Sequence, residues 1–243
     1  MTPTLLPTRQ SDRASTAMPN ATTGAPIVTA GRPPRLGATL ALCALSLAGF
    51  AALAGHLTHG FEAWTFEALR RQAAMEGKLV APALALRDAQ GRSFQLFDAS
   101  AVGSPVYLVD FVYTRCMTVC AALGSEYQQM QRAMSANPSS RVRLLSISID
   151  PAHDNARALL AYGNRHQADP ARWTLAAPRD EAAGQAALRQ FGLIAIPDGF
   201  GGYVHNGGIH LIDAQGKVHG IFDYGQWPQA LKAANRLAEG APQ

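Results

Sequence analysis

Two cysteines, Cys116 and Cys120, are the residues of this chain best suited to chemistry. They lie in the segment VDFVYTRCMTVC, directly after an apolar run typical of a buried strand. Such a pair can be a disulfide, a metal clamp or small hydrophobic core residues. We expect Cys116 just beyond the strand and Cys120 in the first turn of the next helix, where α/β sheets place their sites and the helix dipole stabilises a thiolate. This position argues against inert packing.

The spacing of the two cysteines bears on the choice between disulfide and metal. Residues i and i+4 of a regular helix have Cβ atoms about 5–6 Å apart, whereas a relaxed disulfide needs about 3.5–4.5 Å. A disulfide therefore requires Cys116 to leave helical geometry. A shared metal ion tolerates a wider separation, and soft thiolates favour Cu(I) with two or three ligands, whereas zinc usually takes four. The pair suits both states, with some rearrangement between them.

A third ligand would come from the seven histidines of the chain. A lone histidine is more often a satisfied polar residue than a ligand. Two border the N-terminal apolar segment, two flank a predicted helix and three cluster near the C-terminal hairpin: His56 and His59, His153 and His166, and His205, His210 and His219. His205 lies in the glycine-rich stretch GGYVHNGG before a predicted strand, whereas His210 falls inside that strand. Because loops carry binding residues disproportionately, His205 is the predicted ligand.

The elements that must position these residues follow an α/β pattern. Two short strands flank a turn at 88–91, and strands at 105–114, 141–150 and 173–177 are each followed by a helix. The first of these helices ends at Asn137-Pro138, and the second has Pro151 near its N-terminus. A strand–turn–strand unit over 209–224 and a closing helix from about Trp227 to Glu239 complete the domain. The order ββ, βα, βα, βα, ββ, α predicts a three-layer α/β domain with a central mixed sheet.

An apolar segment from Leu36 to Leu57 carries no formal charge and contains the third cysteine, Cys43. At about 1.5 Å per helical residue it can cross about 30 Å of hydrocarbon. Arg32 and Arg35 precede it and no Lys or Arg follows until Arg70, so the charge bias predicts a cytoplasmic N-terminus and a domain in an oxidising compartment.

Other interpretations of this segment are weaker. A cleavable signal ending at the Ala-Leu-Ala of 52–54 would be unusually long, and a lipoprotein signal at Cys43 would need a small residue in place of Leu42. The prolines of residues 1–35 oppose the amphipathic helix of a mitochondrial transit peptide. We therefore expect an uncleaved anchor.

The predicted organisation is a disordered cytoplasmic tail over 1–35, a transmembrane anchor over 36–57, a stalk or leading helix over 58–77, and a domain over 78–243. The formal net charge of +4 comes mostly from arginines before residue 58, so the rest of the chain is near neutral. A nucleic-acid partner is not supported. The proline-rich tail and the Ala/Arg/Gly-rich composition favour a bacterial inner membrane with the domain in the periplasm.

Taken together, DFVYTRCMTVC, then SISIDPAHDNARALLAY, then His205 followed by IHLIDAQGKV resemble the SCO/SenC family of membrane-tethered copper proteins. The resemblance spans roughly 78–235. It implies a thioredoxin-like domain in which a CxxxC pair and a distal histidine bind copper and deliver it to the binuclear copper site of cytochrome c oxidase. On this chain the implied ligands are Cys116, Cys120 and His205, for Cu(I) or Cu(II). The implied partners are the copper-site subunit of the oxidase and a thioredoxin-like reductant.

The sequence departs from the family pattern near these ligands. The family commonly has proline after each cysteine and an acidic residue between them, where this chain has Met117, Ala121 and Thr118. It commonly has aspartate before the histidine and an aromatic residue five positions after it, where Val204 and His210 stand here. The ligands are intact, and the departures bear on copper affinity and on partner identity.

Three functions remain open on the residues. A copper chaperone would use Cys116 and Cys120 as thiolates, reduced beforehand, with His205 as a nitrogen ligand. A thiol–disulfide oxidoreductase would reduce the cysteines of another copper protein, but such reductases have CxxC and a cis-proline where this chain has CxxxC and Gly207. A copper or redox sensor is the third. The site composition favours the chaperone over an enzyme, since it suits a soft metal better than dithiol exchange.

Overall fold

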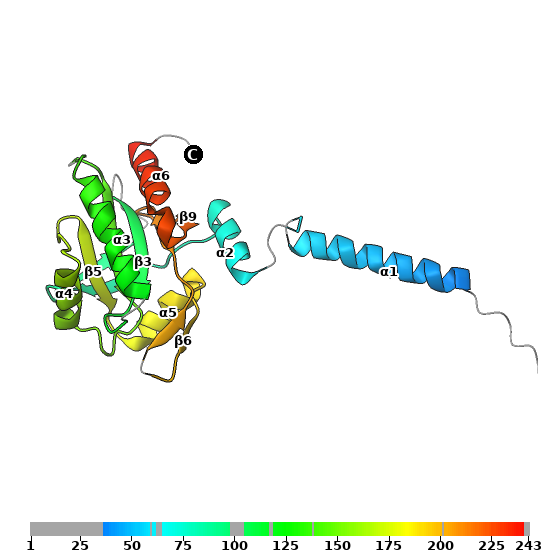
Figure 1. Ribbon diagram of the computed structural model, residues 1–243, viewed down its shortest axis with the longest axis horizontal. Helices are drawn as coiled ribbons and strands as arrows, with labels where there is room; N and C mark the ends of the chain where they lie inside the picture. Colours follow the sequence, from blue (N-terminus) through cyan, green and yellow to red (C-terminus); the bar gives the residue numbers. More distant parts are fainter. Residues whose placement is uncertain are drawn as a thin grey trace, which may run out of the picture. The chain divides into compact units, whose positions relative to one another are not determined.

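A computed structural model of the chain describes residues 36–58, 60–61, 65–97, 105–116, 119–137, 139–200 and 202–240, with the backbone alone for 119–121. The chain divides into two units, residues 1–49 and 50–243, and the second contains the folded domain (Figure 1). Several predictions fall outside the described residues: the tail over 1–35, His59, Met117, Thr118 and the side chains of Cys120 and Ala121.

Helix α1 (Leu36–Leu57) coincides with the predicted apolar segment. It has 22 residues and a mean hydropathy of 2.0, and none of its most apolar window is buried. By length and composition it can cross a membrane, a property that a signal sequence near an N-terminus shares. The helix therefore fits the expected membrane anchor.

In the described part of the chain, a seven-stranded mixed sheet has the order β2-β1-β5-β4-β3-β8-β9. Its strands are β1 (Leu84–Asp88), β2 (Ser93–Leu96), β3 (Val106–Val112), β4 (Val142–Ser148), β5 (Trp173–Pro178), β8 (Ile209–Ile212) and β9 (Val218–Phe222). The central strands β3, β4 and β5 are parallel, whereas β1 and β8 run antiparallel to them. Because helices cover both faces, β3 and β4 are almost wholly buried and appear in the sequence as apolar runs.

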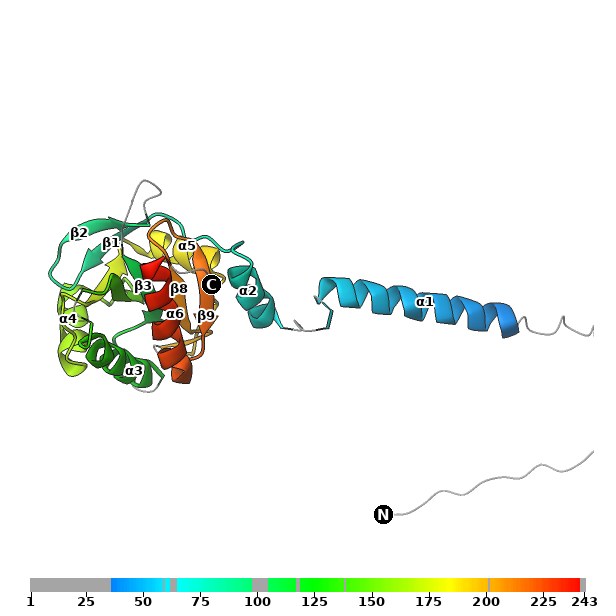
Figure 2. The ribbon, with the colours of Figure 1, turned by 90° about the horizontal axis from the view of Figure 1, so that it is seen from above.

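Helices cover both faces of this sheet. They are α2 (Phe66–Met75), α3 (Val119–Met134), α4 (Ala156–Arg165), α5 (Glu181–Phe191) and α6 (Trp227–Glu239), with a short 3₁₀ turn η1 (Tyr224–Gln226) before α6. Neighbouring residues of a strand face opposite sides: Phe111 of β3 packs on Phe191 of α5, with ring centroids 4.9 Å apart, whereas Asp110 faces Tyr127 of α3. Figure 2 shows α3 and α6 on one side of the sheet and α5 on the other. The predicted three-layer fold is confirmed.

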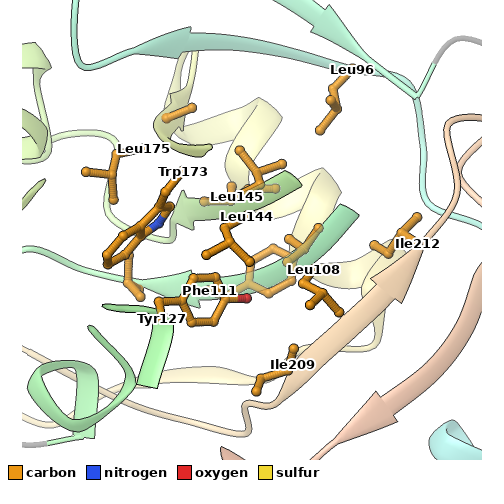
Figure 3. Close-up of a cluster of buried hydrophobic side chains, with 14 of the residues drawn as sticks. Leu96, Leu108, Phe111, Tyr127, Leu144, Leu145, Trp173, Leu175, Ile209 and Ile212 are labelled. Atoms are coloured by element: carbon orange, nitrogen blue, oxygen red, sulfur yellow. The ribbon is translucent and has the colours of Figure 1, made fainter. Parts of the chain in front are cut away.

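The core on the α3 side is built around Trp173, the first residue of β5 (Figure 3). Its side chain is 1% exposed, and its ring tilts against Tyr127 with 5.5 Å between centroids. The indole Nε1–H donates to Ser146 Oγ at 2.9 Å, which satisfies the polar end of the buried ring. Leu144 and Leu108 fill the adjacent strands and are 0% exposed. This packing fixes the carboxyl ends of β3 and β4, from which the cysteine loop and its supporting loop begin.

The predicted strands and helices exist, with one boundary wrong. We expected Pro151 near the N-terminus of a helix, but α4 begins at Ala156 with Asn155 as its N-cap. Residues 151–154 form a turn instead, because the backbone N–H groups of His153 and Asp154 bond to Asp150 O. This turn brings the Asp154 side chain back toward the cysteine loop.

A second hairpin was missed. Strands β6 (Ala195–Pro197) and β7 (Tyr203–His205) pair antiparallel, with Ala195 opposite His205. Asp198 holds the turn between them, since its carboxylate accepts from the N–H groups of Phe200 and Gly202. Strands of three residues among Gly and Pro carry too little periodicity to be predicted. His205 is therefore the last residue of a short strand rather than a loop residue.

Replacing Asn155 by alanine is expected to lower the free energy of unfolding by about 1 kcal/mol. The Asn155 side chain accepts a hydrogen bond from Ala158 N at 3.1 Å, so the variant leaves this first-turn N–H without its cap. Urea unfolding followed by tryptophan fluorescence measures the change. Arg157→Ala, at an exposed position of the same helix, is the matched control and should change stability by less. Equal effects of both substitutions would contradict a capping role.

Candidate metal site at the cysteine loop

Cys116 lies in the loop between β3 and α3 and is 9% exposed. Its N–H bonds to Tyr113 O at 3.1 Å, which closes a turn after the strand. Cys120 is the second residue of α3, whereas Cys116 precedes the helix. The two cysteines are therefore not an i,i+4 pair within one helix, so the obstacle to a disulfide that a regular helix would pose does not apply. Whether the pair forms a disulfide or binds a metal ion stays a prediction.

A buried carboxylate, Asp154, holds the start of this loop. It is 1% exposed and accepts from the hydroxyl of Thr114 at 2.6 Å, from Thr114 N at 3.1 Å and from the hydroxyl of Ser148 at 2.6 Å. Burial raises the pKa of Asp154, and the hydrogen bonds from Ser148 and Thr114 oppose that rise. Asp154 thus joins the ends of β3 and β4 two residues before Cys116.

A second aspartate, Asp150, supports the residue next to Cys116. Its side chain is 2% exposed and accepts from Arg115 Nη2 at 2.7 Å and from His153 Nδ1 at 2.8 Å. Burial acts to raise the pKa of Asp150, but the hydrogen bonds from His153 and Arg115 outweigh it, so the pKa is lowered. An ionised Asp150 therefore holds Arg115 and also engages His153.

His205 is brought to the cysteine loop by the β6–β7 hairpin. Its ring meets the ring of Tyr113 edge to face, with centroids 6.4 Å apart, and Tyr203 packs on the same ring at 5.6 Å. The hydroxyl of Tyr113 points at Tyr203 O, 3.4 Å away. Tyr113 in turn accepts the Cys116 N–H, so one aromatic side chain links the hairpin to the loop.

The hydrogen bonds of His205 define which ring nitrogen is available to a ligand. Nδ1 lies 3.2 Å from Asn206 O, and because a carbonyl only accepts, Nδ1 carries the proton. Nε2 then holds the lone pair. Burial lowers the pKa of His205, with the Asn206 carbonyl acting in the opposite sense, so the ring is neutral at pH 7. A neutral imidazole with its other nitrogen held by a carbonyl is the usual state of a metal-ligating histidine.

His210 has a structural role instead. It is 0% exposed, with Nε2 2.8 Å from Arg70 Nη1 and Nδ1 3.3 Å from Val109 O. Since Arg70 only donates, His210 Nε2 accepts and Nδ1 donates, so both nitrogens are engaged. Burial, together with the charge of Arg70, lowers the pKa of His210 to about 3. This histidine is neutral, fully engaged and unsuited to ligation.

The other described histidines are held elsewhere in the fold. His219 bonds Asp213 at 2.8 Å, and His166 packs on Tyr162 with 4.6 Å between centroids. Among the described side chains, which exclude Cys120, no group of three or more His, Cys, Asp or Glu gathers around a common point. The described ligand candidates are therefore Cys116 and His205, linked through Tyr113.

Sequence analysis missed three residues that organise this region: Tyr113, Asp154 and Asn206. Asp154 had a signal, because Ser148, Asp150 and Asp154 all follow a buried strand at the end of the sheet that carries the cysteines. The other two had none, since the contact of Tyr113 with His205 spans most of the domain and Asn206 acts mainly through its backbone.

The fold and the loop define the class of protein: a thioredoxin-like domain with a CxxxC loop after its first parallel strand and a histidine brought alongside by a later hairpin. The chain belongs to the SCO1/SenC family, since residues 73–239 match the model of that family. The predicted resemblance is confirmed.

Relatives agree with this assignment. The chain is 26% identical over 115 residues to the SCO1 protein homolog of Bacillus subtilis (strain 168); the match covers 46% of this chain and 59%, less than two thirds, of that relative. Bradyrhizobium japonicum ScoI with copper bound has a TM-score of 0.53 at 22% identity, covering 65% of this chain and 98% of that one. BsSco, described with a disulfide switch and as a member of the Sco family of cytochrome c oxidase assembly proteins, has a TM-score of 0.53 at 21% identity, covering 65% and 95%. At these identities the solved structures establish the fold.

Proposed function

We propose that this protein is a copper chaperone that binds copper through Cys116, Cys120 and His205 and delivers it during assembly of cytochrome c oxidase. The observation that carries the proposal is the packing of His205 against Tyr113, whose carbonyl accepts the Cys116 N–H. A histidine remote in sequence thereby lies beside the cysteine loop. Family membership, the copper-bound ScoI structure and the description of BsSco support the same conclusion.

The chemistry follows from the ligand set. Two thiolates and one neutral imidazole suit Cu(I), a soft ion that accepts three ligands, and Cu(II) is the alternative cargo. Thiols lose their protons on binding, and a disulfide supplies no thiolate. Oxidation of the pair therefore switches binding off, and a thioredoxin-like partner must supply two electrons and two protons to restore the dithiol. The receiving partner is the copper-site subunit of the oxidase.

The membrane arrangement is part of the proposal. Helix α1 anchors residues 36–57 in the inner membrane, with residues 1–35 as a cytoplasmic tail and residues 78–243 as the periplasmic domain. Arg32 and Arg35 before the apolar segment support this orientation, because basic residues stay on the cytoplasmic side. A periplasmic domain is also where a reductant for the cysteines is needed.

Anaerobic titration of the reduced full-length chain in detergent tests the proposal. We expect one equivalent of Cu(I) to bind against a competing chelator. His205→Ala should lose at least about a hundredfold in affinity, because outer support alone is typically worth 10- to 100-fold. His219→Ala is the matched control, since His219 is held by Asp213. Failure to bind one equivalent overturns the copper proposal, and an unchanged His205→Ala affinity removes His205 from the site.

The disulfide switch described for BsSco keeps one alternative, a thiol–disulfide oxidoreductase that reduces a copper-site dithiol. The same variant separates the two functions. Reduction of a protein disulfide by the metal-free dithiol form should survive His205→Ala, whereas copper transfer should not. Turnover that is fast and insensitive to the variant, without copper binding, would establish the oxidoreductase.

A further inference from the structure

Asn206, the residue after His205, has its main hydrogen-bonding groups occupied. Its N–H bonds Ile194 O at 3.2 Å, and its side-chain Oδ1 accepts from Ile194 N at 2.6 Å. Its Nδ2 donates to Glu67 Oε2 at 3.0 Å and to Gly192 O at 3.3 Å. Its carbonyl is the group that accepts the Nδ1–H of His205. The orientation of this carbonyl is therefore fixed by four hydrogen bonds to other elements.

The partner that comes from farthest away is Glu67, in the first turn of α2. Arg70 Nε and Nη2 donate to its two oxygens at 2.9 and 2.8 Å, and Arg71 Nε donates at 3.0 Å. Burial acts to raise the pKa of Glu67, but the hydrogen bonds from Arg70 and Asn206 outweigh it, so the pKa is lowered. An ionised Glu67 thus accepts from two arginines and from Asn206 at once.

Arg70 locks α2 in this place. It is 5% exposed, and besides its two bonds to Glu67 its Nη1 donates to Phe191 O at 3.1 Å and to His210 Nε2 at 2.8 Å. Gly192, with φ of 64°, is the only kind of residue that fits beside it, because a Cβ there would lie 2.8 Å from Arg70 Cδ. Since a buried guanidinium without partners is costly, α2 has one docked position.

From this chain of contacts we propose that Glu67 and Asn206 are positioning residues for His205: Glu67 fixes Asn206, whose carbonyl holds the Nδ1–H of His205 and leaves Nε2 free to bind copper. The inference rests on the proposed role of His205 as a ligand. It makes α2, the helix that follows the apolar segment in sequence, part of the support of the metal site. Docking of α2 then sets copper affinity as well as tethering the domain.

The test is Cu(I) affinity of the full-length Glu67→Gln variant in detergent. The new amide group faces donors of Arg70, Arg71 and Asn206, so at least one of these contacts becomes donor against donor. We expect about tenfold weaker binding, the lower end of the effect of removing outer support. Asn206→Ala should do the same. Glu76→Gln, where Glu76 bonds Gln72 and Lys78 at the other end of α2, is the matched control and should bind as the wild type does.

A double-mutant cycle separates positioning from general damage. If Glu67 acts through His205, Glu67→Gln should weaken binding in the wild type and add nothing in the His205→Ala background. In the metal-free protein, ¹⁵N NMR of the imidazole should show the Nδ1–H form of His205 in the wild type and a shift toward the Nε2–H form in Glu67→Gln.

The outcomes distinguish this inference from the proposed function. Unchanged binding in His205→Ala overturns both. A loss in His205→Ala with wild-type affinity and an unchanged tautomer in Glu67→Gln overturns the positioning role alone. Equal losses from Glu67→Gln in the presence and absence of His205 would also overturn it, because the effect would then not pass through the ligand.

Discussion

Replacing Asp110 by asparagine is expected to change the pH dependence of stability by about 4 kcal/mol between pH 4 and pH 8. Asp110 is 0% exposed in the middle of β3, and among the described residues neither of its oxygens has a hydrogen-bond partner. Burial raises the pKa of Asp110 to about 7, from 3.8, although Ser146 and Tyr127, which face it, act in the opposite direction. The folded chain thus keeps this carboxyl protonated where the unfolded chain ionises it.

The sign follows from proton binding. Below about pH 4 both states hold the proton and the full contribution to stability is present; as the pH rises toward 7 only the folded state holds it, so this contribution is progressively lost. Asparagine does not titrate, so Asp110→Asn should gain stability relative to the wild type over this window.

Urea unfolding of both proteins at several pH values measures the difference. Taking the difference at each pH cancels groups common to both, including His210, whose lowered pKa makes stability fall as the pH drops below about 6.5. Asp169→Asn, at a half-exposed carboxylate, is the control and should show a flat difference. A flat difference for Asp110→Asn would mean that this carboxyl titrates alike in both states.

Replacing Asp154 by asparagine is expected to lower the free energy of unfolding by about 3 kcal/mol and to loosen the cysteine loop. One carboxylate oxygen accepts from the Thr114 hydroxyl and the other from Thr114 N and Ser148 Oγ, at distances between 2.6 and 3.1 Å. An amide places an NH₂ where one oxygen stood. Either orientation then sets this group against a buried donor.

Two measurements check this expectation. Urea unfolding gives the stability, and hydrogen exchange of the amides of Thr114 and Cys116 should become faster in the variant than exchange of the β3 interior. Asp180→Asn is the matched control, because Asp180 caps α5 through a single accepted bond from Ala183 N, which asparagine can also accept. If Asp154→Asn leaves stability and exchange at the loop unchanged, the carboxylate does not hold the loop.

The sequence determined the layers of the fold and the place of the cysteines. The apolar runs of β3 and β4, the helical segments after them and the closing helix Trp227–Glu239 were all predicted, because burial on both faces and a period of 3.6 residues leave a local signal. The position of Cys116 and Cys120 at the strand–helix junction followed from the same signals. Cys43 fell in the predicted apolar helix for the same reason.

The tertiary structure alone decided how the region around the cysteines is supported. The β6–β7 hairpin, the turn of residues 151–154 and the docking of α2 depend on hydrogen bonds between residues far apart in sequence, such as Glu67 with Asn206. Sequence favoured His205 over His210 on loop placement, which was wrong in detail. What separates the two in the structure is that Arg70 and Val109 occupy both nitrogens of His210, whereas the Asn206 carbonyl holds one nitrogen of His205. Periodicity records which face of an element is buried, but only the folded chain brings a donor to its acceptor.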